Sequence, residues 1–273
     1  MNRGCLELGH VVNLGVIYFL TIPRAILGPW LLAIHLLACS AWFIIVSIFT
    51  GNRKSETKVV QDWAKGALWI SGVKVTVKGL ERIPDGGVVY VFNHTSNLDI
   101  PIIHASIPRD FRFGAKAELF RIPIFRWAMR RSGALEIPRA QRNQAFKVLE
   151  RAEERIRRGE SFVLAPEGTR QEKDELGSFR SGPFVVALKA QAPLVPLIIR
   201  GAGKIMPKGS MVLNWRSLYN HVELEVLEPI RTSGMEYDHR DELKNTVRER
   251  MLRAHQKSEP SAGLAIDAAL QQL

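Results

Sequence analysis

The sequence predicts an α/β domain, because short β-prone runs alternate with amphipathic stretches of helical period over residues 73–256. Polar residues follow directly after two of these runs, around His94 and Glu167. Loops at strand ends are where α/β domains carry their sites, so we expect the function there. A nearly uncharged stretch precedes the domain, with Arg24 as the only formally charged residue between positions 11 and 50.

The predicted elements give a mixed, largely parallel sheet. Runs rich in β-branched and aromatic residues predict strands at 73–77, 88–92, 111–115, 134–137, 161–165, 194–199 and 222–227. The last run alternates apolar and polar residues, which predicts an edge strand. Helical periodicity predicts one helix that begins near residue 101 and three more at 141–158, 184–190 and 238–256. Residues 59–70 form an amphipathic link.

The uncharged N-terminal stretch predicts a membrane segment. Residues 27–49 are 23 consecutive residues without a formal charge, and about 20 apolar residues span a bilayer core as a helix. Residues 11–22 are too few to span, and Pro23 with Arg24 ends that run. That piece lies in the interface or forms the first arm of a re-entrant hairpin. The alternative is a pair of buried helices in a soluble core.

Charge predicts an anionic partner and an orientation. Lys+Arg (38) minus Asp+Glu (27) gives +11, which suits nucleic acid, phospholipid head groups or phosphorylated metabolites. The basic residues after the apolar stretch place the rest of the chain on the cytoplasmic face, the inner membrane in a bacterium: Arg53, Lys54 and Lys58. Nine basic residues interleave with apolar ones further on, which suits a membrane surface: Arg109, Arg112, Lys116, Arg121, Arg126, Arg130, Arg131, Arg139 and Arg142.

His94 and Asp99 are the catalytic candidates. Five residues on a helix correspond to about 140° of rotation, so the two would not share a helical face. They can meet across a strand-to-helix turn. A carboxylate on one ring nitrogen leaves the other free as a general base, which suits removal of a proton from an alcohol. Asn93 either positions this turn or donates to a developing oxyanion.

Four ordered motifs resemble those of the membrane acyltransferases of glycerolipid synthesis, the lysophosphatidate and glycerol-3-phosphate acyltransferase family. They are Asn93-His94-x-x-x-x-Asp99, Gly133-x-x-x-Ile137-x-Arg139, Pro166-Glu167-Gly168-Thr169-Arg170 and Val195-Pro196-Leu197-Ile198. The resemblance covers roughly residues 73–200. It implies a two-layer α/β acyltransferase domain at 59–257, preceded by a helical membrane motif at 1–58 and followed by a peripheral or weakly ordered tail at 258–273.

The resemblance also implies a reaction. An acyl thioester, acyl-CoA or acyl-carrier protein, would donate its acyl group to the free hydroxyl of 1-acylglycerol 3-phosphate (lysophosphatidate), giving phosphatidate without a resident cofactor or metal. His94 would be the general base and Asp99 would orient it. No covalent acyl-enzyme is expected, because neither Cys5 nor Cys39 lies near the motifs and no Gly-x-Ser-x-Gly elbow is present. The partners are then the phospholipid bilayer, lysophosphatidate and the acyl donor, not nucleic acid.

Six further residues are candidates for substrate binding. Lys116, Arg139 and Arg170 suit the acceptor phosphate, because guanidinium groups match phosphate oxygens bidentately and Lys adds a point charge. Three residues of the third motif complete the set. Glu167 either hydrogen-bonds the glycerol hydroxyls or braces the loop. Gly168 lets the backbone approach the ligand, and Thr169 can hydrogen-bond the ligand.

Other functions stay open at this point. The acceptor could be glycerol 3-phosphate, another lysophospholipid or a lyso-aminolipid. A different class is a membrane-anchored basic protein that binds lipid head groups or nucleic acid without turnover. A third is a membrane hydrolase of acyl thioesters, with water in place of the acceptor.

Overall fold

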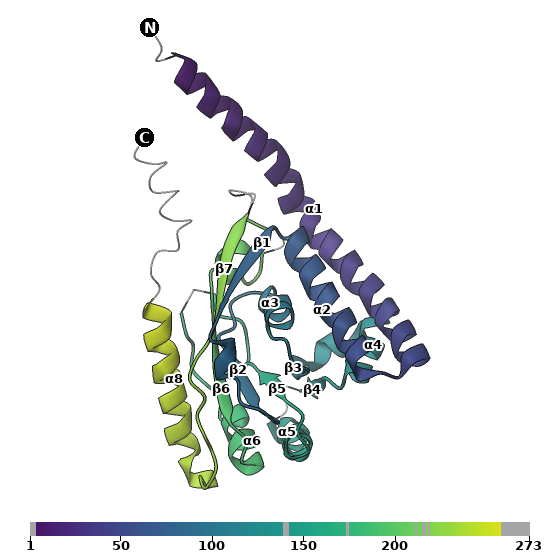
Figure 1. Cartoon of the computed structure of the whole chain (residues 1–273), viewed down its shortest axis with the longest axis vertical. Helices are drawn as coiled ribbons and strands as arrows, with labels where there is room; N and C mark the ends of the chain where they lie inside the picture. Colours follow the sequence, from purple (N-terminus) through teal and green to yellow (C-terminus); the bar gives the residue numbers. More distant parts are fainter. Residues whose placement is uncertain are drawn as a thin grey trace.

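The computed structural model describes residues 4–138, 142–172, 175–210, 212–214, 217 and 219–257. A seven-stranded sheet lies at its centre, with helices on both faces (Figure 1). The strands are β1 (Val73–Lys78), β2 (Val89–Phe92), β3 (Arg112–Lys116), β4 (Leu135–Ile137), β5 (Phe162–Leu164), β6 (Leu194–Arg200) and β7 (Asn220–Val226). The α-helices are α1 (Gly4–Thr50), α2 (Arg53–Ile70), α3 (Asp99–Ser106), α4 (Phe125–Ser132), α5 (Arg142–Arg157), α6 (Gly182–Ala190), α7 (Ala202–Ile205) and α8 (Arg240–Gln256).

The sheet is mixed and largely parallel, as the sequence predicts. Its strand order is β1-β7-β6-β2-β5-β3-β4. The five strands from β6 to β4 are parallel, and only the β6–β7 pair is antiparallel. The α/β class is therefore confirmed.

The prediction that residues 222–227 form an edge strand is wrong, because β7 lies between β1 and β6. Its alternation has another cause. The apolar side chains of β7 enter the core on one face, whereas Glu223 and Glu225 on the other face pair with Arg200 of β6 at 2.5 and 2.8 Å. Polar alternation here marks an ion-pair ladder across the sheet.

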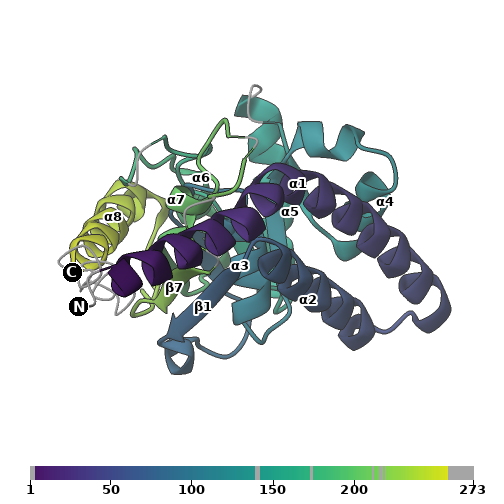
Figure 2. The same cartoon turned by 90° about the horizontal axis from the view of Figure 1, so that it is seen from above.

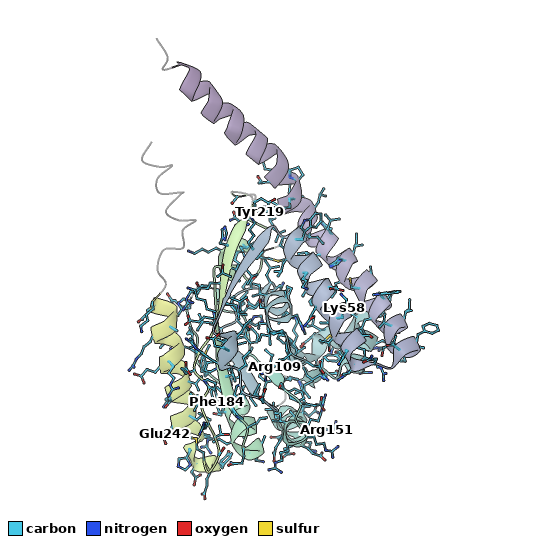
Figure 3. The ribbon with its side chains drawn as sticks, viewed as in Figure 1. Lys58, Arg109, Arg151, Phe184, Tyr219 and Glu242 are labelled. Carbon is cyan, nitrogen blue, oxygen red and sulfur yellow. The ribbon has the colours of Figure 1, made fainter. Side chains whose placement is uncertain are left out.

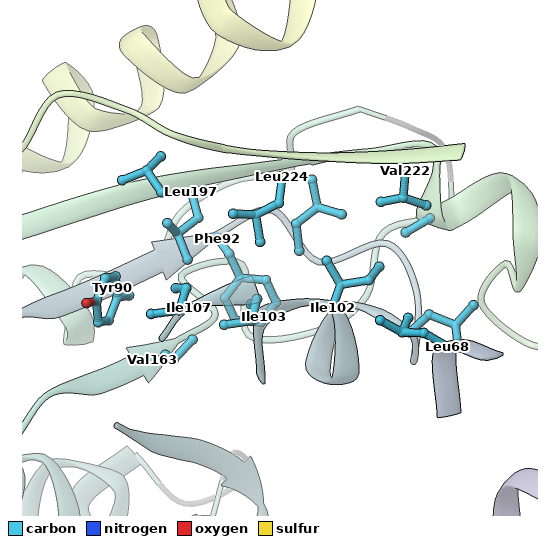
Figure 4. Packing of buried hydrophobic residues seen from close by; sticks show 14 of the residues in the cluster. Leu68, Tyr90, Phe92, Ile102, Ile103, Ile107, Val163, Leu197, Val222 and Leu224 are labelled. Carbon is cyan, nitrogen blue, oxygen red and sulfur yellow. The ribbon is translucent and has the colours of Figure 1, made fainter. Parts of the chain in front are cut away.

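Two apolar cores, one on each face of the sheet, hold the fold together. Successive strand residues point to opposite faces, so Tyr90 and Phe92 pack with Ile102 and Ile103 of α3 (Figure 4). Val89, one residue away from Tyr90, packs into the other core, to which α5, α6 and α8 contribute. Burying each such side chain stabilises the fold by about 1.5–3 kcal/mol.

The N-terminal region is a helical hairpin. Helix α1 is continuous for 47 residues through Pro23 and Pro29, so the prediction that Pro23 and Arg24 end the first apolar run is wrong. Arg24 donates to the backbone carbonyl of Ser217 at 2.5 Å, which gives its charge a partner without ending the helix. Helix α2 turns back along α1 (Figure 2). Gly66 lies at the crossing, where a Cβ atom would come 2.5 Å from His35 Nε2.

Helix α1 also carries the one described segment that is long and apolar enough to cross a membrane, Thr21–Thr50. Its outer side exposes Trp30, Ile34 and Phe49, and its N-terminal part projects beyond the sheet (Figure 1).

The predicted domain boundary at residue 58 falls inside α2. The predicted tail, 258–273, lies outside the described residues.

Candidate active site

The first and third sequence motifs meet with Lys116 at one edge of the sheet, whereas the fourth motif lies within β6 and is buried in the core. Strands β2, β5, β3 and β4 are consecutive and parallel, so their carboxyl ends lie side by side. His94 follows β2, Lys116 is the last residue of β3, and the Pro166 to Arg170 motif follows β5. Segments that are more than 70 residues apart in the chain therefore form one site.

His94 is held by a buried carboxylate. Its Nδ1 donates to Asp99 Oδ2 at 2.8 Å, and the same oxygen accepts the backbone N–H groups of Thr95 and Ser96 at 2.9 Å each. Asp99 is fully buried as the first residue of α3, whereas His94 is 13% exposed and lines a cavity. The predicted contact across a strand-to-helix turn is confirmed. With Nδ1 occupied, Nε2 carries the free lone pair.

Glu167 joins the loop after β5 to the loop after β2. Its Oε1 accepts the backbone N–H of His94 at 3.2 Å, and its Oε2 accepts that of Gly177 at 3.4 Å. Gln171 closes the junction by donating its backbone N–H to the carbonyl of His94 at 2.8 Å. Burial raises the pKa of the Glu167 carboxyl to about 7. These hydrogen bonds brace the loop after β5 against the loop after β2, which is the second of the two roles predicted for Glu167.

Asn93 braces the site from the other side. Its carboxamide nitrogen donates to the backbone carbonyl of Ile199 at 2.8 Å, and its oxygen accepts the Ile199 N–H at 2.7 Å. The side chain is buried. Both the carboxamide nitrogen and the carboxamide oxygen are thus engaged by β6, which corresponds to the positioning role.

Gly168 makes the tight turn of the third motif. Its φ is +73°, a region that favours glycine, and a Cβ atom would lie 2.6 Å from Arg180 Nε. Neither Gly168 nor Glu167 lines the cavity, whereas Thr169 and Arg170 do.

The cavity lies between the helical hairpin and the sheet. Its volume is about 630 Å³. It is lined by α1, α2, α3 and α4, by β3 and the loop before it, and by the loops after β2 and β5. His94, Lys116, Thr169 and Arg170 are on its wall. Away from these residues the wall is mostly apolar, with side chains that include Leu32, Leu36, Phe43, Val59, Phe113, Leu119, Phe125, Ala128 and Met129. Arg139 lies outside the described residues.

The basic residues of the cavity differ in what they bind. Arg112 is buried and holds Asp110 with two bonds, at 2.5 and 2.8 Å. Among the described residues, no carboxylate lies within ion-pair distance of Lys116 or Arg170, so both charges are available to a ligand. Other members of the predicted basic set are paired internally: Arg109 with Asp85, Arg130 with Glu136 and Arg131 with Glu56.

Several cavity residues have no motif in the sequence. Gln61, Trp63 and His104 reach the cavity from α2 and α3 through tertiary packing alone. Asn97, exposed and three residues after His94, could have been found from its place in the first motif. Cys39 also lines the cavity, so the expectation that neither cysteine lies near the motifs holds along the sequence but not in space.

Comparison with known proteins gives consistent matches. A family model described as Acyltransferase matches residues 74–200. The chain is 35% identical to the chloroplastic 1-acyl-sn-glycerol-3-phosphate acyltransferase LPAT1 of Arabidopsis thaliana, over 71% of this chain and 56% of that protein. It is 30% identical to the putative 1-acyl-sn-glycerol-3-phosphate acyltransferase acl-2 of Caenorhabditis elegans, over 76% and 72% of the two chains.

A solved structure has the same fold. The crystal structure of the 1-acyl-sn-glycerophosphate acyltransferase PlsC from Thermotoga maritima superposes with a TM-score of 0.72 at 25% identity, covering 88% of this chain and 97% of that one.

The match to the Arabidopsis protein spans little more than half of that protein's length, and the match to its Brassica napus counterpart spans 63%.

Proposed function

The chain belongs to the 1-acyl-sn-glycerol-3-phosphate acyltransferase family, and we propose that it acylates the free hydroxyl of 1-acylglycerol 3-phosphate from an acyl thioester, giving phosphatidate. The observation that carries this proposal is the position of His94. Its Nδ1 is fixed by Asp99, and its ring lies on the wall of a cavity that combines unpaired cations with a long apolar surface.

The proposed chemistry uses the free nitrogen of His94. Nε2 takes the proton of the acceptor hydroxyl as that oxygen attacks the thioester carbonyl, and Asp99 stabilises the imidazolium that forms. The tetrahedral intermediate then expels the thiolate, which recovers the proton from the imidazolium. The acyl carbon has exchanged a C–S bond for a C–O bond. General base catalysis of this kind contributes about 10²- to 10⁴-fold.

The wall of the cavity suits both parts of the acceptor. Lys116 and Arg170 supply unpaired positive charge for the phosphate, Thr169 supplies a hydroxyl, and Arg139 is proposed for the same phosphate from its place in the second motif. Glu167 acts here through the backbone of His94. The apolar part of the wall suits acyl chains.

The helical hairpin suits work at a bilayer. Exposed apolar residues of α1 would enter lipid together with the exposed Trp127 of α4 and the exposed Ile122 and Ile124 just before it. The basic residues after α1 favour a cytoplasmic position for the sheet domain. In this arrangement a lysolipid reaches His94 without leaving the membrane surface.

The test is an assay of the purified protein with labelled acyl-CoA and with acyl-carrier protein, with and without lysophosphatidate. Phosphatidate that forms only when lysophosphatidate is present supports the proposal. Free fatty acid that forms at the same rate without acceptor would indicate a thioester hydrolase. Lipid binding without turnover of either donor would indicate a binding protein.

A further inference from the structure

A second, basic cavity adjoins the catalytic one. It has a volume of about 420 Å³ and lies between α2 and residues 108–110. Figure 3 labels Lys58 on α2 and Arg109 in the loop before β3. The cavity is lined by five basic residues, Arg53, Lys54, Lys58, Lys65 and Arg109, and by two acidic ones, Asp62 and Asp110.

The two cavities are adjacent and share part of their wall, because five residues line both of them: Arg53, Thr57, Gln61, Arg109 and Asp110. A ligand that extends across this shared wall would place one end among the cations and the other beside His94. The apolar part of the catalytic cavity remains free for a chain attached to the inner end.

Lys54 and Lys65 carry positive charge that the fold does not use. Both are exposed on α2, and no carboxylate among the described residues lies within ion-pair distance of either. Lys58, on the same face of the helix, already pairs with Asp62 at 2.8 Å. Arg109 is fixed by Asp85 at 3.1 Å and by the carbonyl of Pro84 at 2.5 Å.

The wall shared by the two cavities combines paired charges with neutral groups, since Arg53 lies 3.6 Å from Asp110 and Arg109 lies 3.1 Å from Asp85. Gln61 presents a carboxamide, and Trp63 packs edge-on against His104 at a centroid distance of 6.0 Å. His104 stacks on Phe111 at 4.7 Å, and burial lowers its pKa to about 3, so the ring is neutral near pH 7. Neutral donors and acceptors suit amide groups.

We infer that the basic cavity binds the phosphates of coenzyme A, so that acyl-CoA lies with its nucleotide end at Lys54 and Lys65 and its thioester at His94. This inference rests on the proposed function. The order of surfaces matches the order of groups in the donor: phosphates on cations, the amide-bearing pantetheine arm beside the Gln61 carboxamide, the thioester at His94 and the acyl chain on the apolar wall. A concave site with several cations suits a compact ligand with several phosphates.

The test compares two charge-reversal variants of the full-length, detergent-purified protein. Lys54→Glu/Lys65→Glu alters the basic cavity. Lys147→Glu/Lys189→Glu alters two exposed lysines of α5 and α6 and changes the net charge equally. For each protein we would measure KM for acyl-CoA and for an acyl-N-acetylcysteamine thioester, which lacks phosphate, and the Kd of free coenzyme A by calorimetry.

We expect Lys54→Glu/Lys65→Glu to raise both the KM for acyl-CoA and the Kd for coenzyme A about tenfold, which corresponds to about 1.4 kcal/mol. The effect weakens as salt is added. KM for the truncated thioester stays at the wild-type value, and the control variant behaves as the wild type.

Several results would overturn it. One is an unchanged coenzyme A Kd in the Lys54→Glu/Lys65→Glu variant. Another is an equal rise in KM for both thioesters. Loss of binding to anionic phospholipid vesicles with acyl-CoA kinetics intact would assign the lysines to lipid head groups, and a rise in KM for acyl-carrier protein alone would assign them to that protein. If wild type makes no product from any thioester, the proposed function fails, and the coenzyme A Kd still decides this site.

Discussion

The carboxylate of Glu167 accepts the backbone N–H of His94 at 3.2 Å, so the loop after β5 sets the position of the loop after β2. This contact spans 73 residues of sequence. It makes the third motif a support for the first, and it places a buried acid with a pKa of about 7 beside the site.

Glu167→Gln should remove a pH dependence of stability. Burial raises the native pKa of Glu167 from 4.5 to about 7, so between these values the native state binds more protons than the unfolded state. Stability then falls as pH rises from about 5 to 7, by up to about 3 kcal/mol. Chemical denaturation across this range should show the fall in wild type and a flatter profile in Glu167→Gln. The matched control is Glu172→Gln, whose carboxylate is exposed in the same loop; identical slopes in wild type and Glu167→Gln would contradict the assignment.

Asn93→Ala should destabilise the fold. The substitution leaves the Ile199 N–H and carbonyl without their side-chain partner in a buried position, and each unpaired group costs about 1–3 kcal/mol. The expected loss in free energy of unfolding is about 2–4 kcal/mol. Asn97→Ala, at an exposed asparagine of the same motif, should change it by less than about 0.5 kcal/mol. Denaturant midpoints of the two variants give the comparison, and equal midpoints would argue against the brace.

Arg170→Ala should chiefly raise the KM for lysophosphatidate. A lost charge-assisted contact to phosphate costs about 1.5–3 kcal/mol, which corresponds to about 10- to 100-fold. Because the contact is made in the ground state and the transition state alike, kcat should change much less. Lys116→Ala should act in the same direction, and Lys147→Ala on the exposed face of α5 should have no effect. An unchanged acceptor KM in Arg170→Ala would remove this residue from the phosphate site.

Ala128→Phe should shift the acyl-chain preference toward shorter chains. Ala128 of α4 packs with Phe43 and Val59 on the apolar wall of the cavity, and a larger side chain there fills space that a long chain would occupy. Ala128→Val should give a smaller shift. Relative rates with donors of increasing chain length measure the effect, and a profile that stays the same in both variants would show that this wall does not contact the chain.

Much of this fold could be predicted because the signal is local. The strands that carry the motifs are short and rich in β-branched residues, and His94 and Asp99 are five residues apart in one turn. The position of β7 could not be predicted, since its polar face is satisfied by Arg200 of β6 and not by solvent. Helix α1 continues through Pro23, and the partner of Arg24 is the carbonyl of Ser217, which lies 193 residues further along the chain and which no local pattern reveals.

The candidate site could also be predicted where it depends on local sequence signals, and not where it depends on tertiary contacts. His94, Lys116 and Arg170, which end or follow strands, came together as expected, because parallel neighbours end at one edge. The roles of Asn93 and Glu167 depend on backbone groups of Ile199 and Gly177, which no spacing in the sequence reveals. The α2 side of the cavity has no motif at all and follows only from packing of the hairpin on the domain.

The role of His94 is tested most directly by the turnover of purified His94→Ala with acyl-CoA and lysophosphatidate. If His94 is the general base, kcat should fall about 10²- to 10⁴-fold in this variant. It should also fall in Asp99→Asn, and both variants should retain membrane association. Phosphatidate formation by His94→Ala at a rate near that of wild type would contradict the assignment of His94 as the base.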